Sequence, residues 1–247
     1  MAANDGTPAI GRTLIHNVYI VNEGRSFLGY VLVEGDTISA VGEGAPEPEL
    51  IASANAIDGA GRLLLPGVID THVHFRDPGL THKADMATES MAAVAGGITS
   101  FIDMPNTKPP TISIAEVDRK MDRAREVSVA NYAFFIGATD SNLPELARAD
   151  YSRVAGVKLF MGSSTGNMLV SDPAAIDAIF SSVPAIVAVH AEDETLLRQR
   201  RQAVIDRYGE NLPIDFHPVI RNHDVCFEAS RRIVELARAH RHRLHLL

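Results

Sequence analysis

Cysteine is almost absent from the sequence, since Cys226 is the single one among 247 residues. One thiol cannot form an internal disulfide framework, so a reducing compartment is expected, with the cytoplasm as the default location. The sequence also lacks an apolar run long enough to span a membrane, and its polar start is not that of a signal peptide. Neither membrane insertion nor secretion is predicted.

Blocks of basic residues are missing as well. The formal net charge is −8, and acidic and basic residues are spread along the chain. Neither nucleic acid nor a membrane surface is therefore expected as a partner. The composition, 46% hydrophobic and 22% charged, is that of an ordinary globular protein long enough for one or two domains.

The most informative stretch is residues 63–79, an apolar run that ends in two histidines, an arginine and a Pro-Gly stop. Such a run is typical of a strand buried on both faces. Because side chains alternate along a strand, His72 and His74 should project to one face roughly 7 Å apart, where they could share a divalent cation. Arg76 follows in the same period, where a substrate anion could lie. A core pair of hydrogen-bonded histidines is the alternative, which the strand-end position disfavours.

Two architectures are expected on either side of this stretch. Strands are predicted before it at residues 14–21, 27–33, 37–41 and 56–65, with a loop at 42–49. We interpret residues 1–65 as a small β domain. Later strands are predicted at 98–104, 129–138, 154–161, 185–190 and 243–247, and helices are predicted to begin near Ser113, Asp172, Glu192 and Asp224.

The alternation after residue 66 is the pattern of parallel βαβ units. Polar residues (His74, Asp103, Lys158 and His190) fall where the expected strands end, and in a (β/α)₈ barrel these ends form the active-site face. No Gly-x-Gly-x-x-Gly turn follows the first strand, which disfavours a doubly wound open sheet. We predict an α/β fold with a TIM-type barrel over residues 66–247, of which about five to six strands are present. An open half-barrel would expose strand edges, so we expect the sequence to be part of a longer protein.

Lys158 is the second chemical signal, because it lies within an apolar strand. A bare ammonium is costly there unless it is paired or neutralised. One reading is a lysine that reaches the barrel mouth or pairs with a carboxylate. The other is a deprotonated lysine that takes up carbon dioxide and becomes an anionic carbamate able to bridge two metals. His190, at the end of another strand, would complete a cluster of three histidines and one lysine.

These residues carry a resemblance to the amidohydrolase superfamily and, within it, to the dihydroorotases. The stretch from Leu65 to His74 is typical of the superfamily. Phe75-Arg76-Asp77-Pro78-Gly79 together with Met104-Pro105-Asn106-Thr107 is typical of dihydroorotase-like members. The Lys158 strand with the segment that follows it, and Val189-His190-Ala191-Glu192, complete the match.

The resemblance implies a ligand set and an activity. His72 and His74 would hold the more buried zinc, carboxylated Lys158 would bridge two zincs, and His190 would hold the second. Arg76 and Asn106 would bind the substrate's carboxylate, and Ser164 and Thr165 would lie in a lid. The implied reaction is the interconversion of N-carbamoyl-L-aspartate and (S)-dihydroorotate in pyrimidine synthesis. A carboxylate-bearing ring suits a guanidinium beside an amide, whereas hydantoin and dihydrouracil offer no such group.

The sequence departs from the family at its end. Members place a further metal-binding histidine after the sixth strand and a general-base Asp at the eighth. Both are expected beyond residue 247, so no catalytic residue is assigned within the chain, and His245 is not promoted to a ligand. In the family the N-terminal β segment usually packs with C-terminal strands into a composite β-sandwich.

Other readings stay open beside this one. The alternatives are an allantoinase or a dihydropyrimidinase-like hydrolase, or a non-catalytic scaffold for a partner such as aspartate transcarbamoylase. A homodimer is compatible with the family. Asp70 and Asp103 are each as well explained by structural roles as by roles in the site. His82 is expected to have no role in the site.

Overall fold

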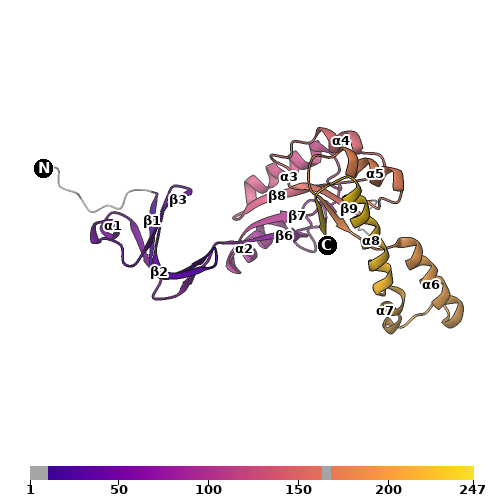
Figure 1. Ribbon diagram of the computed structural model, residues 1–247, viewed down its shortest axis with the longest axis horizontal. Helices are drawn as coiled ribbons and strands as arrows, with labels where there is room; N and C mark the ends of the chain where they lie inside the picture. The colour runs from indigo at the N-terminus through magenta and orange to yellow at the C-terminus, as the bar shows by residue number, and fades with distance from the viewer. Residues whose placement is uncertain (1–10, 163–167) are drawn as a thin grey trace. The chain divides into compact units, whose positions relative to one another are not determined.

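The computed structural model describes residues 11–162 and 168–247 (Figure 1). They divide into two compact units, Met1–Gly67 and Val68–Leu247. Ser164 and Thr165, the predicted lid residues, lie outside the described residues.

The first unit is a sheet built around β1. The strands β1 (Arg12–Asn22), β2 (Arg25–Glu34) and β3 (Thr37–Glu43) form antiparallel hairpins, and β4 (Asn55–Asp58) and β5 (Leu63–Leu64) pair with β1 in parallel. The predicted run 56–65 is therefore two strands. The turn between them begins at Gly59, where only a glycine fits, because a Cβ there would lie 2.0 Å from a methyl carbon of Val18. The predicted loop at 42–49 runs into α1 (Pro48–Ala52), whose proline stands in the first turn, where its missing N–H costs nothing.

The second unit is a curled parallel sheet with helices (Figure 1). In the described residues its strand order is β11-β10-β9-β8-β7-β6, and every neighbouring pair is parallel. The strands are β6 (Val68–Val73), β7 (Ile98–Asp103), β8 (Asn131–Gly137), β9 (Gly156–Phe160), β10 (Val187–His190) and β11 (Leu244–Leu246). This confirms the predicted alternation of strands and helices. The run that begins at Leu63, however, is not one strand buried on both faces: it is divided between β5 and β6, and Val68 and Ile69 of β6 are 55% and 62% exposed.

The helices follow the strands in sequence. They are α2 (Met86–Ala95), α3 (Ile114–Val127), α4 (Leu143–Arg148), α5 (Pro173–Ser182), α6 (Glu194–Tyr208), α7 (His217–Ile220) and α8 (His223–Ala239), with a 3₁₀ turn at Ile214–Phe216 before α7. Ser113 and Asp172 cap α3 and α5 as predicted, each accepting a hydrogen bond from a backbone N–H of the first turn. None of the helices in the described ranges is long and apolar enough to cross a membrane.

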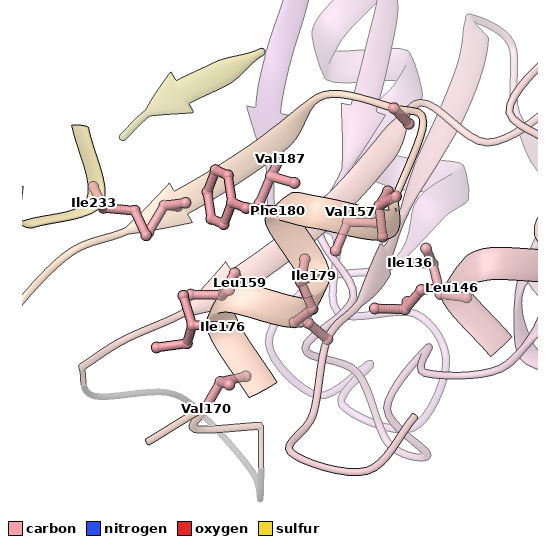
Figure 2. Packing of buried hydrophobic residues seen from close by; sticks show 14 of the residues in the cluster. Ile136, Leu146, Val157, Leu159, Val170, Ile176, Ile179, Phe180, Val187 and Ile233 are labelled. Carbon is pink, nitrogen blue, oxygen red and sulfur yellow. The ribbon is translucent and has the colours of Figure 1, made fainter. Parts of the chain in front are cut away.

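The main core lies between the sheet and its helices. Val157 and Leu159 of β9 and Val187 of β10 pack against Ile179 and Phe180 of α5 (Figure 2). Side chains alternate along each strand, so the residues between these core positions face the opposite side of the sheet. Lys158 and His190 belong to that opposite face.

Candidate metal centre and substrate site

His72 and His74 lie together where β6 ends. Their Nε2 atoms are 3.3 Å apart, and their ring centroids are 5.1 Å apart. Two imidazole nitrogens, each about 2.0–2.1 Å from one tetrahedral zinc, are about 3.3 Å apart. The pair therefore has the spacing that a shared ion requires.

Both rings are biased towards the neutral form, which is the one that binds metals. Burial lowers the pKa of His72, and the nearby charge of Lys158 lowers it further. Burial also lowers the pKa of His74, although its hydrogen bond to Asn106 opposes the effect. At neutral pH the two nitrogens that face each other can both offer lone pairs.

Asn106 joins the histidine pair to Arg76. Its side-chain Oδ1 accepts a hydrogen bond from His74 Nδ1 at 2.7 Å, which leaves Nε2 of that ring with its lone pair. The backbone carbonyl of Asn106 accepts from Arg76 Nη1 at 3.5 Å, and Asn106 itself is only 6% exposed. Arg76 has a left-handed backbone with φ of 65°, a conformation rare outside glycine that is often found at functional sites. The two predicted substrate-binding residues are therefore adjacent, and the Nδ2 group of Asn106 has no hydrogen-bond acceptor within the described part of the chain.

Lys158 is fully buried, and its Nζ has no hydrogen-bond partner among the described residues. The amine stands 4.7 Å from the centroid of the Phe160 ring. Burial lowers the pKa of Lys158 to about 7. A lysine in this state carries a nucleophilic neutral amine near neutral pH, as carbamate formation needs.

His190 shares this face of the sheet. Lys158 pairs with Ala188, and Phe160 pairs with His190, so all four side chains point the same way. Among residues 11–162 and 168–247, however, no three His, Cys, Asp or Glu side chains gather closely enough to hold an ion by themselves. The face thus supplies a close histidine pair, a separate histidine and an orphan lysine amine. This donor set fits the implied metal centre only if Lys158 contributes.

Glu192 and Arg221 were not anticipated as part of the site. Glu192 Oε2 lies 3.2 Å from His190 Nε2, and both carboxylate oxygens accept from Arg221 Nη1, at 3.0 and 2.7 Å. Glu192 stood in the matched motif, but nothing near it in the sequence points to an arginine 29 positions later.

Asp103 lies on the helix side of the sheet and not on the face of the candidate site. Its register with Val73 places it there, fully buried, and its Oδ2 is 2.5 Å from Nζ of the equally buried Lys120 in α3. Oδ1 of Asp103 accepts from the backbone N–H of Phe75. The structural reading of Asp103 is correct. Lys120 was missed, although it stands on the apolar stripe of α3 between Val117 and Ala124.

The structure also places the three residues to which the sequence assigned no definite role, Asp70, His82 and His245. Asp70 Oδ1 accepts from the backbone N–H of His72 at 3.0 Å and so shapes the end of β6. His82 is exposed. His245 pairs with Ala188 and therefore faces the same side as Lys158.

Known proteins resemble the chain over most of its length. Residues 63–242 match the profile described as Amidohydrolase family. The chain is 32% identical to the dihydroorotase of Methanosarcina acetivorans over 210 residues, covering 83% of this chain and 43% of the relative. It is 39% identical to the dihydroorotase of Halobacterium salinarum (66% and 38% covered) and 34% identical to the allantoinase of Solibacter usitatus (92% and 50% covered).

Solved structures give the same assignment of fold. The L-hydantoinase from Arthrobacter aurescens superposes with a TM-score of 0.87 at 24% identity, covering 96% of this chain and 52% of that one. The dihydropyrimidinase from Brevibacillus agri gives 0.80, also at 24% identity, with 95% and 51% covered. These likenesses confirm the predicted barrel-type α/β fold. The chain spans half or less of the length of the curated relatives named above. It belongs to the amidohydrolase family.

Proposed function

We propose that the chain forms the metal-binding part of a zinc-dependent cyclic amide hydrolase of the dihydroorotase type, which acts in the cytoplasm. The reaction would be the interconversion of N-carbamoyl-L-aspartate and (S)-dihydroorotate in pyrimidine synthesis. The observation that carries the proposal is the buried amine of Lys158, which has no hydrogen-bond partner among the residues that the structure describes and lies on the face that also bears His190. A core lysine of this kind has no structural use unless a ligand completes it.

His72 and His74 would hold one zinc through their facing Nε2 atoms, and His190 would hold a second. Carboxylated Lys158 would bridge the two. When bound, zinc supplies positive charge that polarises an amide carbonyl and makes water more acidic near neutral pH. We assign no residue of this chain the role of general base.

Arg76 and Asn106 would hold the ring carboxylate of the substrate. The guanidinium can donate two parallel hydrogen bonds to a carboxylate, and Nδ2 of Asn106 can add a third while Oδ1 keeps His74 oriented. This arrangement would fix the ring in one orientation relative to the histidine pair. The geometry therefore favours an acid-bearing ring over a neutral one.

Zinc analysis and ligand binding test the proposal. We expect the 247-residue chain, incubated with zinc and bicarbonate and then dialysed, to retain bound zinc by mass spectrometry, and His74→Ala and Lys158→Met to lose most of it. By calorimetry, the zinc-loaded chain should bind dihydroorotate more tightly than hydantoin. Arg76→Met should remove this preference, whereas Arg125→Met, which changes an exposed helix residue, should retain it. Retention of no zinc by the parent chain would contradict the proposal.

Allantoinase is the second candidate, because the allantoinase of Solibacter usitatus matches 92% of the chain at 34% identity. Allantoin has no ring carboxylate, so its recognition would not need the charge of Arg76. Calorimetry that shows tighter binding of allantoin than of dihydroorotate, unaffected by Arg76→Met, would establish this alternative.

A further inference from the structure

The contacts of Glu192 limit how His190 can be protonated. A carboxylate only accepts hydrogen bonds, so the nitrogen beside it must carry the hydrogen. Glu192 Oε2 lies 3.2 Å from His190 Nε2, which makes Nε2 the N–H atom of the neutral ring. Nδ1 is then the atom that keeps a lone pair.

The carboxylate of Glu192 is itself held in place. It is 6% exposed and accepts two charge-assisted hydrogen bonds from Arg221. The segment after β9 passes close to the base of this side chain, because a Cβ on Gly162 would lie 2.6 Å from Cβ of Glu192. Little freedom is left for Glu192 to turn away from His190.

Arg221 reaches Glu192 from a distant part of the chain. After Asp193 the chain leaves the sheet through α6 and α7, and it returns at Arg221, at the end of α7. A hydrogen bond from the backbone N–H of Asp193 to the carbonyl of Val225 joins the departing and returning segments. The α6–α7 excursion therefore ends in a side chain that contacts the candidate site.

His74 shows the opposite arrangement. There Asn106 accepts from Nδ1, and Nε2 keeps the lone pair. The two histidines therefore keep the lone pair on different ring nitrogens: Asn106 leaves it on Nε2 of His74, and Glu192 leaves it on Nδ1 of His190.

We propose that Glu192, fixed by Arg221, is a positioning residue that holds His190 as the Nε2–H tautomer and presents its Nδ1 as the metal-binding atom. The inference rests on the proposed function, in which His190 is a zinc ligand. It makes the α6–α7 excursion part of the metal centre, although neither helix supplies a ligand.

Histidine nitrogen NMR tests the tautomer directly and needs no metal or activity. In the zinc-free chain at alkaline pH, long-range proton–nitrogen spectra should show His190, assigned through His190→Gln, protonated at Nε2. Glu192→Leu should shift His190 to a mixture of tautomers. Glu192→Gln should retain most of the Nε2–H form, because its amide oxygen can still accept, and Arg221→Met should give an intermediate result.

Zinc affinity supplies the second readout. Glu192→Leu should lower the affinity for the zinc that His190 binds by about 10–100-fold. This is the usual loss of metal affinity when the hydrogen-bond partner of a metal-bound histidine is removed. Glu194→Gln is the matched control. Glu194 lies two positions after Glu192, at the start of α6, and pairs with the exposed Arg198 instead of with His190. His74, expected to remain Nδ1–H throughout, reports that each variant is folded.

The outcomes separate the two proposals. If His190 is Nδ1–H in the parent chain, or if Glu192→Leu leaves its tautomer unchanged, the positioning inference is wrong, whatever zinc does. If the parent chain binds no zinc but shows the expected tautomers, the proposed function fails and the hydrogen-bond assignment stands. Should Glu192→Leu not fold, the Glu192→Gln and Arg221→Met spectra decide.

Discussion

Lys158 is the residue on which the candidate centre depends. Its amine is fully buried without a hydrogen-bond partner in the described parts of the chain, and burial lowers its pKa from 10.5 to about 7. Between these values the unfolded chain keeps the proton that the folded chain has released. Stability contributed by this group must therefore rise with pH in that window.

We expect the free energy of unfolding of the metal-free chain, relative to that of Lys158→Met, to increase between pH 7 and pH 9.5. One proton gives at most about 1.4 kcal/mol per pH unit. Urea titrations at several pH values, with carbon dioxide excluded, measure the difference. Parallel pH profiles for the two proteins would show that Lys158 keeps an ordinary pKa.

Single residues differ in how far the sequence reveals them. Lys158 could be predicted because a lysine inside an apolar strand has no solvent to reach, and His72 and His74 because alternation puts them on one face. Arg221 could not, since its contact with Glu192 forms only after the chain has run through α6 and α7. No local pattern encodes such a contact.

Among the elements, α3 is anchored by a buried ion pair. Lys120 and Asp103 are both fully buried, and Lys120 also donates to the carbonyl of Met104 at 2.9 Å. Asp103 in turn accepts from the backbone of Phe75. The pair therefore ties the helix to the ends of β6 and β7, next to His74 and Asn106.

Lys120→Met should destabilise the chain by about 3–5 kcal/mol, because it leaves the carboxylate of Asp103 buried and unpaired. Adding Asp103→Leu should recover part of the loss, since the uncompensated charge is then gone. Urea denaturation measures both effects. Arg125→Met, on the exposed face of the same helix, is the control and should cost less than about 1 kcal/mol. An equal loss in all three variants would count against the pair's special role.

Elements were predictable where their pattern was long or strongly marked. The buried strands β9 and β10 follow from apolar runs, and the capped helices α3 and α5 follow from Ser113 and Asp172. Four helices, α1, α2, α4 and α7, were not anticipated. The helix α2 is rich in small apolar residues without a clear stripe, and the other three have only four to six residues, so packing rather than local preference forms them. Asp103 shows that a polar strand end does not by itself say which face a side chain takes.

For the whole molecule, the parallel sheet has two edges. In the described residues β6 pairs only with β7, and β11 pairs only with β10. Ile69 on β6 is 62% exposed, and Leu246 on β11 is 42% exposed. Exposed apolar edge strands favour pairing with further strands.

We expect the isolated chain to self-associate as its concentration rises, and Ile69→Lys to reduce this, since edge lysines oppose strand pairing. Sedimentation velocity over a range of concentrations measures the effect. Val129→Lys is the control, because Val129 is similarly exposed but does not lie on a strand. A chain that stays monomeric at high concentration would show that these edges are already protected.

The Lys120–Asp103 pair has a consequence for the ions dissolved around the protein. Mobile ions cannot come between two charges that solvent does not reach, so raising the sodium chloride concentration weakens this pair far less than an exposed one such as Arg125–Asp122. The ends of β6 and β7 are thus held by an attraction that is insensitive to ionic strength. The positions of His74 and Asn106 should accordingly be the same at low and at high sodium chloride concentration.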